Sequence, residues 1–220
     1  MFIEQGIKPE NKFWKYILGF LLFMIAYTIG QGPFTLAVLY KSTSMGKGIP
    51  TDPSELMNVL DSNLTLFLLL LTFVAAFIGI YIAVRYINQQ KFIEIVTARK
   101  KVDWNRVFFS FSLWAVFTIV SIAIMYYTSP QDFVVNFNLV PFLGLAVIAI
   151  LLIPIQTSTE EFVFRGYLMQ GFGTLFLNKW APLLTTSVLF GLMHIFNPEV
   201  DKIGYIILIY YIGTGLFLGI

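Results

Sequence analysis

Two adjacent glutamates and an arginine follow a long apolar run, in the stretch TEEFVFR. Glu161 and Arg165 are four residues apart, so on a helix they share a face and can form an ion pair. Glu160 points about 100° away around the helix axis and has no obvious local partner. A carboxylate without a charged partner, held in a site of low dielectric constant, is suited to act as a general base on water. The stretch therefore predicts acid–base chemistry centred on Glu160.

The only histidine of the chain, His194, lies in the apolar stretch VLFGLMHIF. Phe190 precedes it by four residues, so on a helix the phenyl ring lies beside the imidazole and can form one wall of a pocket. Pro154 precedes Glu160 by about a turn and a half, and a proline inside a helix frees a backbone carbonyl and can kink the helix. Such a kink could open a water-accessible cavity beside the two acids.

Each of these features also has a purely structural interpretation. Acid–base pairs at a membrane boundary are often solvated helix ends, and a single histidine in an apolar helix is often a hydrogen-bonded packing residue. The joint occurrence of an acid pair and a histidine on successive apolar segments is more specific than either part.

The composition predicts the setting of these residues. The chain of 220 residues is 58% hydrophobic and 12% charged, whereas soluble domains have about a quarter of their residues charged. The surplus apolar surface must face lipid, so we predict an all-α, polytopic transmembrane helical bundle. A net charge of +2 does not indicate nucleic-acid binding. The absence of cysteine excludes disulfides and thiolate metal sites. We expect no metal and no cofactor.

Six apolar segments are candidates for spanning helices, each of which needs about 20 apolar residues. The fourth ends at the acid pair, and the sixth is still apolar at the last residue, so we predict about six spans with the last one incomplete. The expected segments are 16–39, 64–84, 107–127, a fourth from 139, 180–196 and a sixth from 203.

The charges of the connecting segments predict the orientation. The connection 85–106 holds six Lys and Arg residues, whereas TSPQDFVVNF holds none. The positive-inside rule places the first in the cytoplasm and the second outside. Lys8, Lys12 and Lys15 place the N-terminus in the cytoplasm as well. The loop between the first two spans is then external, and TDPSELMNVL within it predicts a short helix. The site would lie toward the cytoplasmic side.

The two motifs resemble those of the CAAX-processing type II prenyl endopeptidases and their bacterial relatives, which include bacteriocin-immunity proteins. That family carries a Glu pair, three residues and an Arg, matched here by Glu160, Glu161 and Arg165. Its second motif is Phe, three residues and His, matched by Phe190 and His194. The resemblance implies a three-span N-terminal region over 1–135 and a protease-like core over 136–220.

The resemblance further implies a glutamate-dependent intramembrane endopeptidase. Glu160, helped by His194, would activate a water that attacks a peptide carbonyl, while Glu161 and Arg165 would orient Glu160 and Phe190 would line the pocket. The substrate would be a membrane-associated peptide or protein, and the protein would reside in the bacterial inner membrane. The oligomeric state stays open.

One element of the family pattern is missing. The family has a third motif with a second histidine and an asparagine four residues later, whereas this chain has one histidine and stops at GTGLFLGI. We therefore expect a fragment of a longer protein. Because losing one oxyanion donor costs about 10²–10³ in rate, we do not expect full activity from this polypeptide alone.

Two other functions remain open at this point. A non-catalytic immunity or regulatory protein would bind another membrane protein and would not need Glu160. An ion-coupled carrier would use the acid pair as a cation or proton site, but carriers usually contain internal repeats, and none is visible here.

Overall fold

The computed structural model describes residues 2–46, 48, 50, 52–176 and 178–219. Within these ranges the chain is all-helical and contains no strand. Four helical segments are long and apolar enough to cross a membrane, which confirms the prediction of a polytopic helical bundle: Phe13–Ser44, Ser62–Ile87, Trp104–Thr128 and Leu139–Gly173. Two further apolar helices are shorter within the described residues, Trp180–Leu192 and Ile207–Gly219.

The first two spans form one side of the bundle. Helix α1 (Phe13–Gly30) continues almost directly into α2 (Gly32–Ser44), so the first span is longer than the sequence predicts. Helix α4 (Ser62–Ile82) packs along α1 and is followed by a short π-helix, η2 (Ala83–Ile87). The side chain of Asp61 accepts hydrogen bonds from the backbone N–H groups of Asn63 and Leu64 and so caps α4. The short helix expected in the preceding loop is present as α3 (Pro53–Met57).

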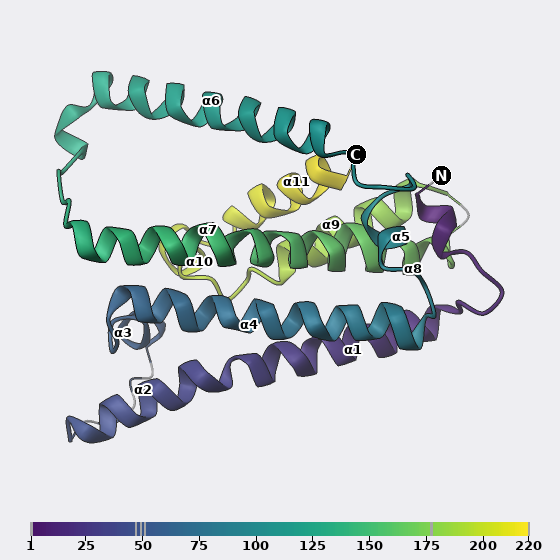
Figure 1. Ribbon diagram of the computed structural model, residues 1–220, viewed down its shortest axis with the longest axis horizontal. Coiled ribbons are helices and arrows are strands. Elements are labelled where there is room, and N and C mark those ends of the chain that lie inside the picture. The colour runs from purple at the N-terminus through teal and green to yellow at the C-terminus, as the bar shows by residue number, and fades with distance from the viewer. Residues whose placement is uncertain (1, 47, 49, 51, 177, 220) are drawn as a thin grey trace.

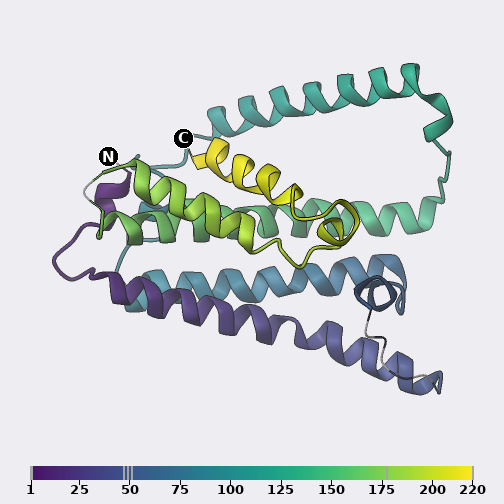
Figure 2. The ribbon, with the colours of Figure 1, turned by 180° about the vertical axis from the view of Figure 1, so that it is seen from behind.

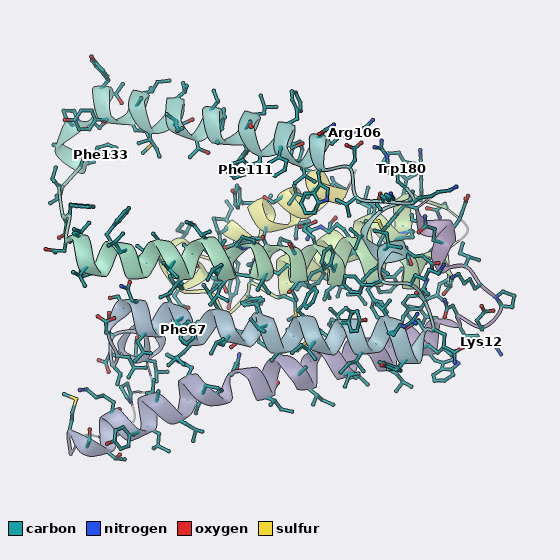
Figure 3. All side chains as sticks on the ribbon, in the orientation of Figure 1. Lys12, Phe67, Arg106, Phe111, Phe133 and Trp180 are labelled. Atoms are coloured by element: carbon teal, nitrogen blue, oxygen red, sulfur yellow. The ribbon has the colours of Figure 1, made fainter. Side chains whose placement is uncertain are left out.

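Helix α6 (Trp104–Thr128) stands apart from the other helices in both ribbon views (Figures 1 and 2). None of its side chains, all of which are described, is buried. The connection after α6 includes the 3-10 turn η3 (Pro130–Asp132) and leads to α7 at the far end of the molecule. Apolar side chains such as Phe111 project from α6 (Figure 3). Such a surface suits contact with lipid or with further apolar helices.

The segment that carries the acid pair does not end there, contrary to the sequence prediction. Helix α7 (Leu139–Glu161) runs through Pro154 and continues as a π-helix, η4 (Phe162–Leu168), and then as α8 (Met169–Gly173). A buried polar pair can be accommodated within a span when neighbouring elements cover it. Helix α4 packs along α7, and the short helix α5 (Ile93–Val96) packs against η4. The acid pair therefore lies within a continuous helical segment against which other elements pack, with the Glu161 side chain still partly exposed.

The remaining helices cover the other side of this span. Helix α9 (Trp180–Leu192) packs against η4, and α11 (Ile207–Gly219) packs against α9. A turn of residues 193–196 and the short helix α10 (Pro198–Ile203) join them. The sequence predicted that His194 lies on a helix, but the structure places it in the turn after α9. The last apolar helix begins at Ile207 rather than near Ile203.

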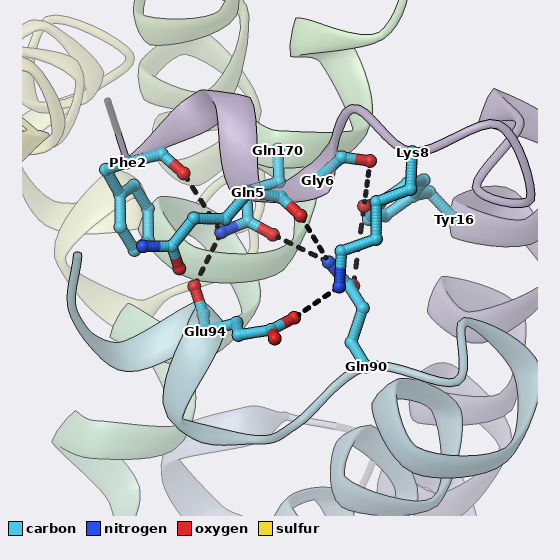
Figure 4. A network of polar contacts seen from close by, with 8 residues as sticks. All are labelled: Phe2, Gln5, Gly6, Lys8, Tyr16, Gln90, Glu94 and Gln170. Atoms are coloured by element: carbon cyan, nitrogen blue, oxygen red, sulfur yellow. Dashed lines mark hydrogen bonds and ion pairs between the residues drawn. The ribbon is translucent and has the colours of Figure 1, made fainter. Parts of the chain in front are cut away.

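The N-terminal segment is tied to the connection 85–106 by a polar network (Figure 4). The short 3-10 helix η1 (Ile3–Gly6) packs on α8. The amide of Gln170 donates hydrogen bonds to the backbone carbonyls of Glu94 at 2.7 Å and Phe2 at 3.3 Å. The amide of Gln90 donates to Gln170 Oε1 at 3.3 Å, and Lys8 pairs with Glu94 at 2.7 Å. Both segments that the sequence places in the cytoplasm thus lie at one end of the bundle, where Figure 3 labels Lys12, Arg106 and Trp180. The side of the membrane that this end faces stays a prediction.

Candidate functional site

A cavity of about 180 Å³ lies where the two motifs meet. Its polar lining comes from four side chains on α7 and on the segment after α9, and its apolar walls come from α1, α4, η4 and α9. The polar residues are Gln156, Glu160, His194 and Asn197; the apolar and aromatic residues are Phe23, Met24, Tyr27, Phe73, Phe164, Phe190 and Met193. At about 30 Å³ per molecule, this volume holds several waters.

Glu160 is partly buried at the edge of this cavity, and it has a neutral partner. Gln156 Nε2 donates a hydrogen bond to Glu160 Oε1 at 3.4 Å. The expectation that Glu160 has no local partner was therefore wrong, because Gln156 lies one helical turn earlier on the same face. An amide orients a carboxylate without neutralising it, so Glu160 keeps the capacity to accept a proton.

The ion pair expected from the spacing is present. Arg165 Nη1 lies 3.1 Å from Glu161 Oε1, and the Arg165 side chain is almost fully buried whereas that of Glu161 is partly exposed. The Arg165 guanidinium also lies over the Phe190 ring, with Cζ 4.1 Å from the ring centroid. A buried cation is tolerated when a carboxylate and an aromatic face surround it. Arg165 thus connects the acid pair to the helix that leads to His194.

The chemistry of the histidine ring follows from one contact. His194 Nδ1 lies 2.7 Å from the backbone carbonyl oxygen of Phe190. A carbonyl oxygen only accepts hydrogen bonds, so Nδ1 carries the proton. In the neutral ring Nε2 then has a free lone pair and can accept a hydrogen bond from a molecule in the cavity.

Phe190 holds the two motifs together. Its ring centroid lies 4.6 Å from that of His194 and 5.3 Å from that of Phe164, and its face receives the Arg165 guanidinium. The structure therefore places Phe190 between the first motif and the histidine, as well as in the cavity wall.

Two close contacts position the π-helix that carries Arg165. A Cβ on Gly166 would lie 2.5 Å from the Ile95 carbonyl oxygen, so only glycine allows α5 to approach this closely. The fully buried Tyr167 donates a hydrogen bond to Asn88 Oδ1 at 2.7 Å, and its hydroxyl lies 3.1 Å from the Lys15 carbonyl oxygen. A π-helical turn at a functional site is a recurring feature of membrane and soluble helices.

Sequence reasoning missed several residues of this site. Gln156 could have been found, because it lies four residues before Glu160. Asn197 follows His194 by three residues, but nothing in the spacing distinguishes it from a loop residue. Phe23 and Phe73 lie far away along the chain and reach the cavity only because α1 and α4 pack against α7.

Comparison with known proteins gives the family of the C-terminal part. Residues 136–220 match the family model described as type II CAAX prenyl endopeptidase Rce1-like. These residues belong to the Rce1-like family. The Rce1-like region contains both motifs, the π-helix η4 and the turn that carries His194.

The chain as a whole is similar to the uncharacterized protein YyaK of Bacillus subtilis (strain 168). The two are 31% identical over 199 residues, which cover 90% of this chain and 66% of that relative. The chain therefore spans slightly less than two thirds of the length of the relative. No solved structure matches this chain.

The walls of the cavity extend beyond the Rce1-like region, because Phe23, Met24, Tyr27 and Phe73 come from the N-terminal part. Among the described residues, no group of three or more His, Asp or Glu side chains could hold a metal ion. The polar groups around the cavity are one imidazole, one carboxylate, two amides and the Tyr27 phenol. Such a set can polarise a water and move its proton.

Proposed function

We propose that this protein is an intramembrane endopeptidase in which Glu160 and His194 activate a water molecule to hydrolyse a peptide bond of a membrane-associated substrate. The observation that carries the proposal is that Glu160, Gln156 and His194 line one cavity with room for water. Membership of the Rce1-like family supports a protease of the CAAX type.

The reaction follows from the donors and acceptors of the cavity. Glu160 accepts one proton of the water, and His194 Nε2 accepts a hydrogen bond from the other. The water oxygen attacks the carbonyl carbon of the peptide and forms a tetrahedral oxyanion. The carbon–nitrogen bond then breaks as Glu160 passes its proton to the leaving nitrogen and His194 Nε2 accepts the proton of the added hydroxyl, which gives a new amine and a new carboxylate. General acid–base catalysis of this kind contributes about 10²–10⁴-fold to a rate.

The other motif residues support Glu160 in this proposal. Arg165 is held by Glu161 and by the Phe190 ring, and it keeps a positive charge beside the acid pair. Gln156 donates a weak hydrogen bond to the carboxylate of Glu160 through its amide. These side chains are positioning residues, because Glu160 and His194 are the groups that touch the water.

The experiment compares membrane proteins from cells that contain the protein or its Glu160→Gln variant. New N-termini are identified by mass spectrometry of labelled N-terminal peptides. We expect new N-termini with the unmodified protein and with a Glu10→Gln control, which changes an exposed acid outside the motifs. The proposal predicts that they disappear with Glu160→Gln. If the cleavage pattern is the same in all three cases, Glu160 is not the base, and a binding role for the protein takes its place.

A further inference from the structure

The position of His194 is not explained by the two motifs alone. The residue lies in the turn after α9, where no regular helix fixes its side chain. Its neutral ring can do the proposed chemistry only if Nδ1 stays on the Phe190 carbonyl and Nε2 stays available to the cavity. A side chain in a turn needs contacts from elsewhere to hold one ring orientation.

A second aromatic contact to the imidazole ring comes from α11. The Tyr211 ring lies parallel to the imidazole, with centroids 4.1 Å apart and an angle of 21° between the planes. Phe190 contacts the imidazole at 4.6 Å with a tilted ring. Asn197 Nδ2 donates to the Tyr211 hydroxyl at 3.5 Å, which is a weak hydrogen bond. His194 is therefore held by two aromatic rings, one from α9 and one from α11.

Small residues set the distance between those two helices. A Cβ on Gly215 of α11 would lie 3.1 Å from Ser187 Cα of α9, and one on Gly191 of α9 would collide with the Ile212 side chain. The residue numbers of these contacts rise along one helix and fall along the other, so the helices pack antiparallel. The close backbone approach places Tyr211 against the turn that carries His194.

We propose that Tyr211 is a positioning residue that holds the His194 ring with Nδ1 on the Phe190 carbonyl and Nε2 available to the cavity. The inference rests on the proposed function and deepens it. It names a residue outside both motifs, Tyr211, that keeps His194 Nε2 available to accept the hydrogen bond of the water. Tyr211 touches the imidazole and acts through it.

The single histidine of the chain makes a direct test practicable. The protein is labelled with ring-¹⁵N histidine, reconstituted in micelles, and compared with its variants by nitrogen chemical shifts at one pH where the ring is neutral. We expect the unmodified protein to show a protonated Nδ1. Tyr211→Phe keeps the stacked ring and should keep this tautomer. Tyr211→Leu removes the stacked ring and should shift the population toward the Nε2-protonated tautomer that free histidine prefers.

Two further variants separate positioning from folding. Tyr205→Leu makes the same change at an exposed tyrosine before α11 and should leave the tautomer unchanged. Gly191→Ala places a Cβ against the Ile212 side chain, so it pushes α11 away from α9 and should shift the tautomer in the same direction as Tyr211→Leu. If Tyr211→Leu does not fold, Gly191→Ala carries the test. A protonated Nδ1 that persists in every folded variant overturns the proposal.

Cleavage kinetics give the second readout. Tyr211→Leu should lower kcat by about tenfold or more, up to the about 10²–10⁴-fold loss that removal of an acid–base group causes, and leave KM nearly unchanged. Tyr211→Phe should retain most of kcat. The tautomer is measured without any substrate, so a failure of this inference can be told apart from a failure of the proposed hydrolysis.

Discussion

The hydroxyl of Tyr167 joins the π-helix of the first motif to the N-terminal helices, and its removal tests that connection. The side chain is fully buried and its hydroxyl lies 2.7 Å from Asn88 Oδ1 and 3.1 Å from the Lys15 carbonyl oxygen. Tyr167→Phe keeps the ring and its contact with Tyr16, at a centroid distance of 4.8 Å, so the packing stays nearly unchanged. Only the hydrogen-bonding group is lost.

The magnitude follows from what the substitution leaves behind. An unsatisfied buried polar group costs about 1–3 kcal/mol, whereas a hydrogen bond inside a membrane protein contributes about 0.6 kcal/mol on average and about 1.7 at most. Tyr167→Phe leaves the buried Asn88 Oδ1 without this donor, so we expect a loss of about 1–2 kcal/mol in the free energy of unfolding. That loss lowers the folded-to-unfolded ratio by about 5- to 30-fold.

The assay is reversible unfolding in mixed micelles, followed by circular dichroism as the denaturing detergent fraction rises. Tyr127→Phe is the matched control, because Tyr127 is 89% exposed on α6 and its change should stay within about 0.5 kcal/mol. If Tyr167→Phe unfolds at the same detergent fraction as the control, the hydroxyl does not hold η4 to α1 and to Asn88, and this reasoning is wrong.

Two further predictions concern the packing and the membrane. Gly166→Ala should destabilise the protein by about 1–3 kcal/mol, because the new Cβ would lie 2.5 Å from the Ile95 carbonyl oxygen; Gly213→Ala, which meets nothing within 4 Å, should not destabilise it in the same unfolding assay. Phe111→Arg on the exposed face of α6 should make membrane insertion of that helix less favourable by about 2.5–3.5 kcal/mol in a glycosylation-mapping assay. Equal insertion of the two sequences would show that α6 does not span the bilayer.

The sequence predicted what depends on local spacing and on apolar length. Each of the six predicted apolar segments contains a helix, and the Glu161–Arg165 pair forms because four residues make about one helical turn. The helix boundaries were less accurate. The prediction ended the fourth span at the charged residues, but α4, α5 and α9 cover them and the helix continues to Gly173.

The sequence could not predict what depends on distant segments. The stacking of Tyr211 on His194 joins residues from two helices whose separation is set by small side chains. The bonds of Gln170 to Phe2 and Glu94 join segments that no local pattern relates. The π-helical turn η4 is a backbone feature, and its residues also fit an ordinary α-helix.

The central claim is that Glu160 and His194 act on the same water. A double-mutant cycle of Glu160→Gln and His194→Gln, with the cleavage rate of one identified substrate in proteoliposomes as the readout, tests it most directly. Residues that act as a unit are strongly non-additive, so we predict that each single change lowers the rate by about 10²–10⁴-fold and that the double change lowers it little further. Losses that multiply in the double variant, or a rate that survives either single change, would contradict the account.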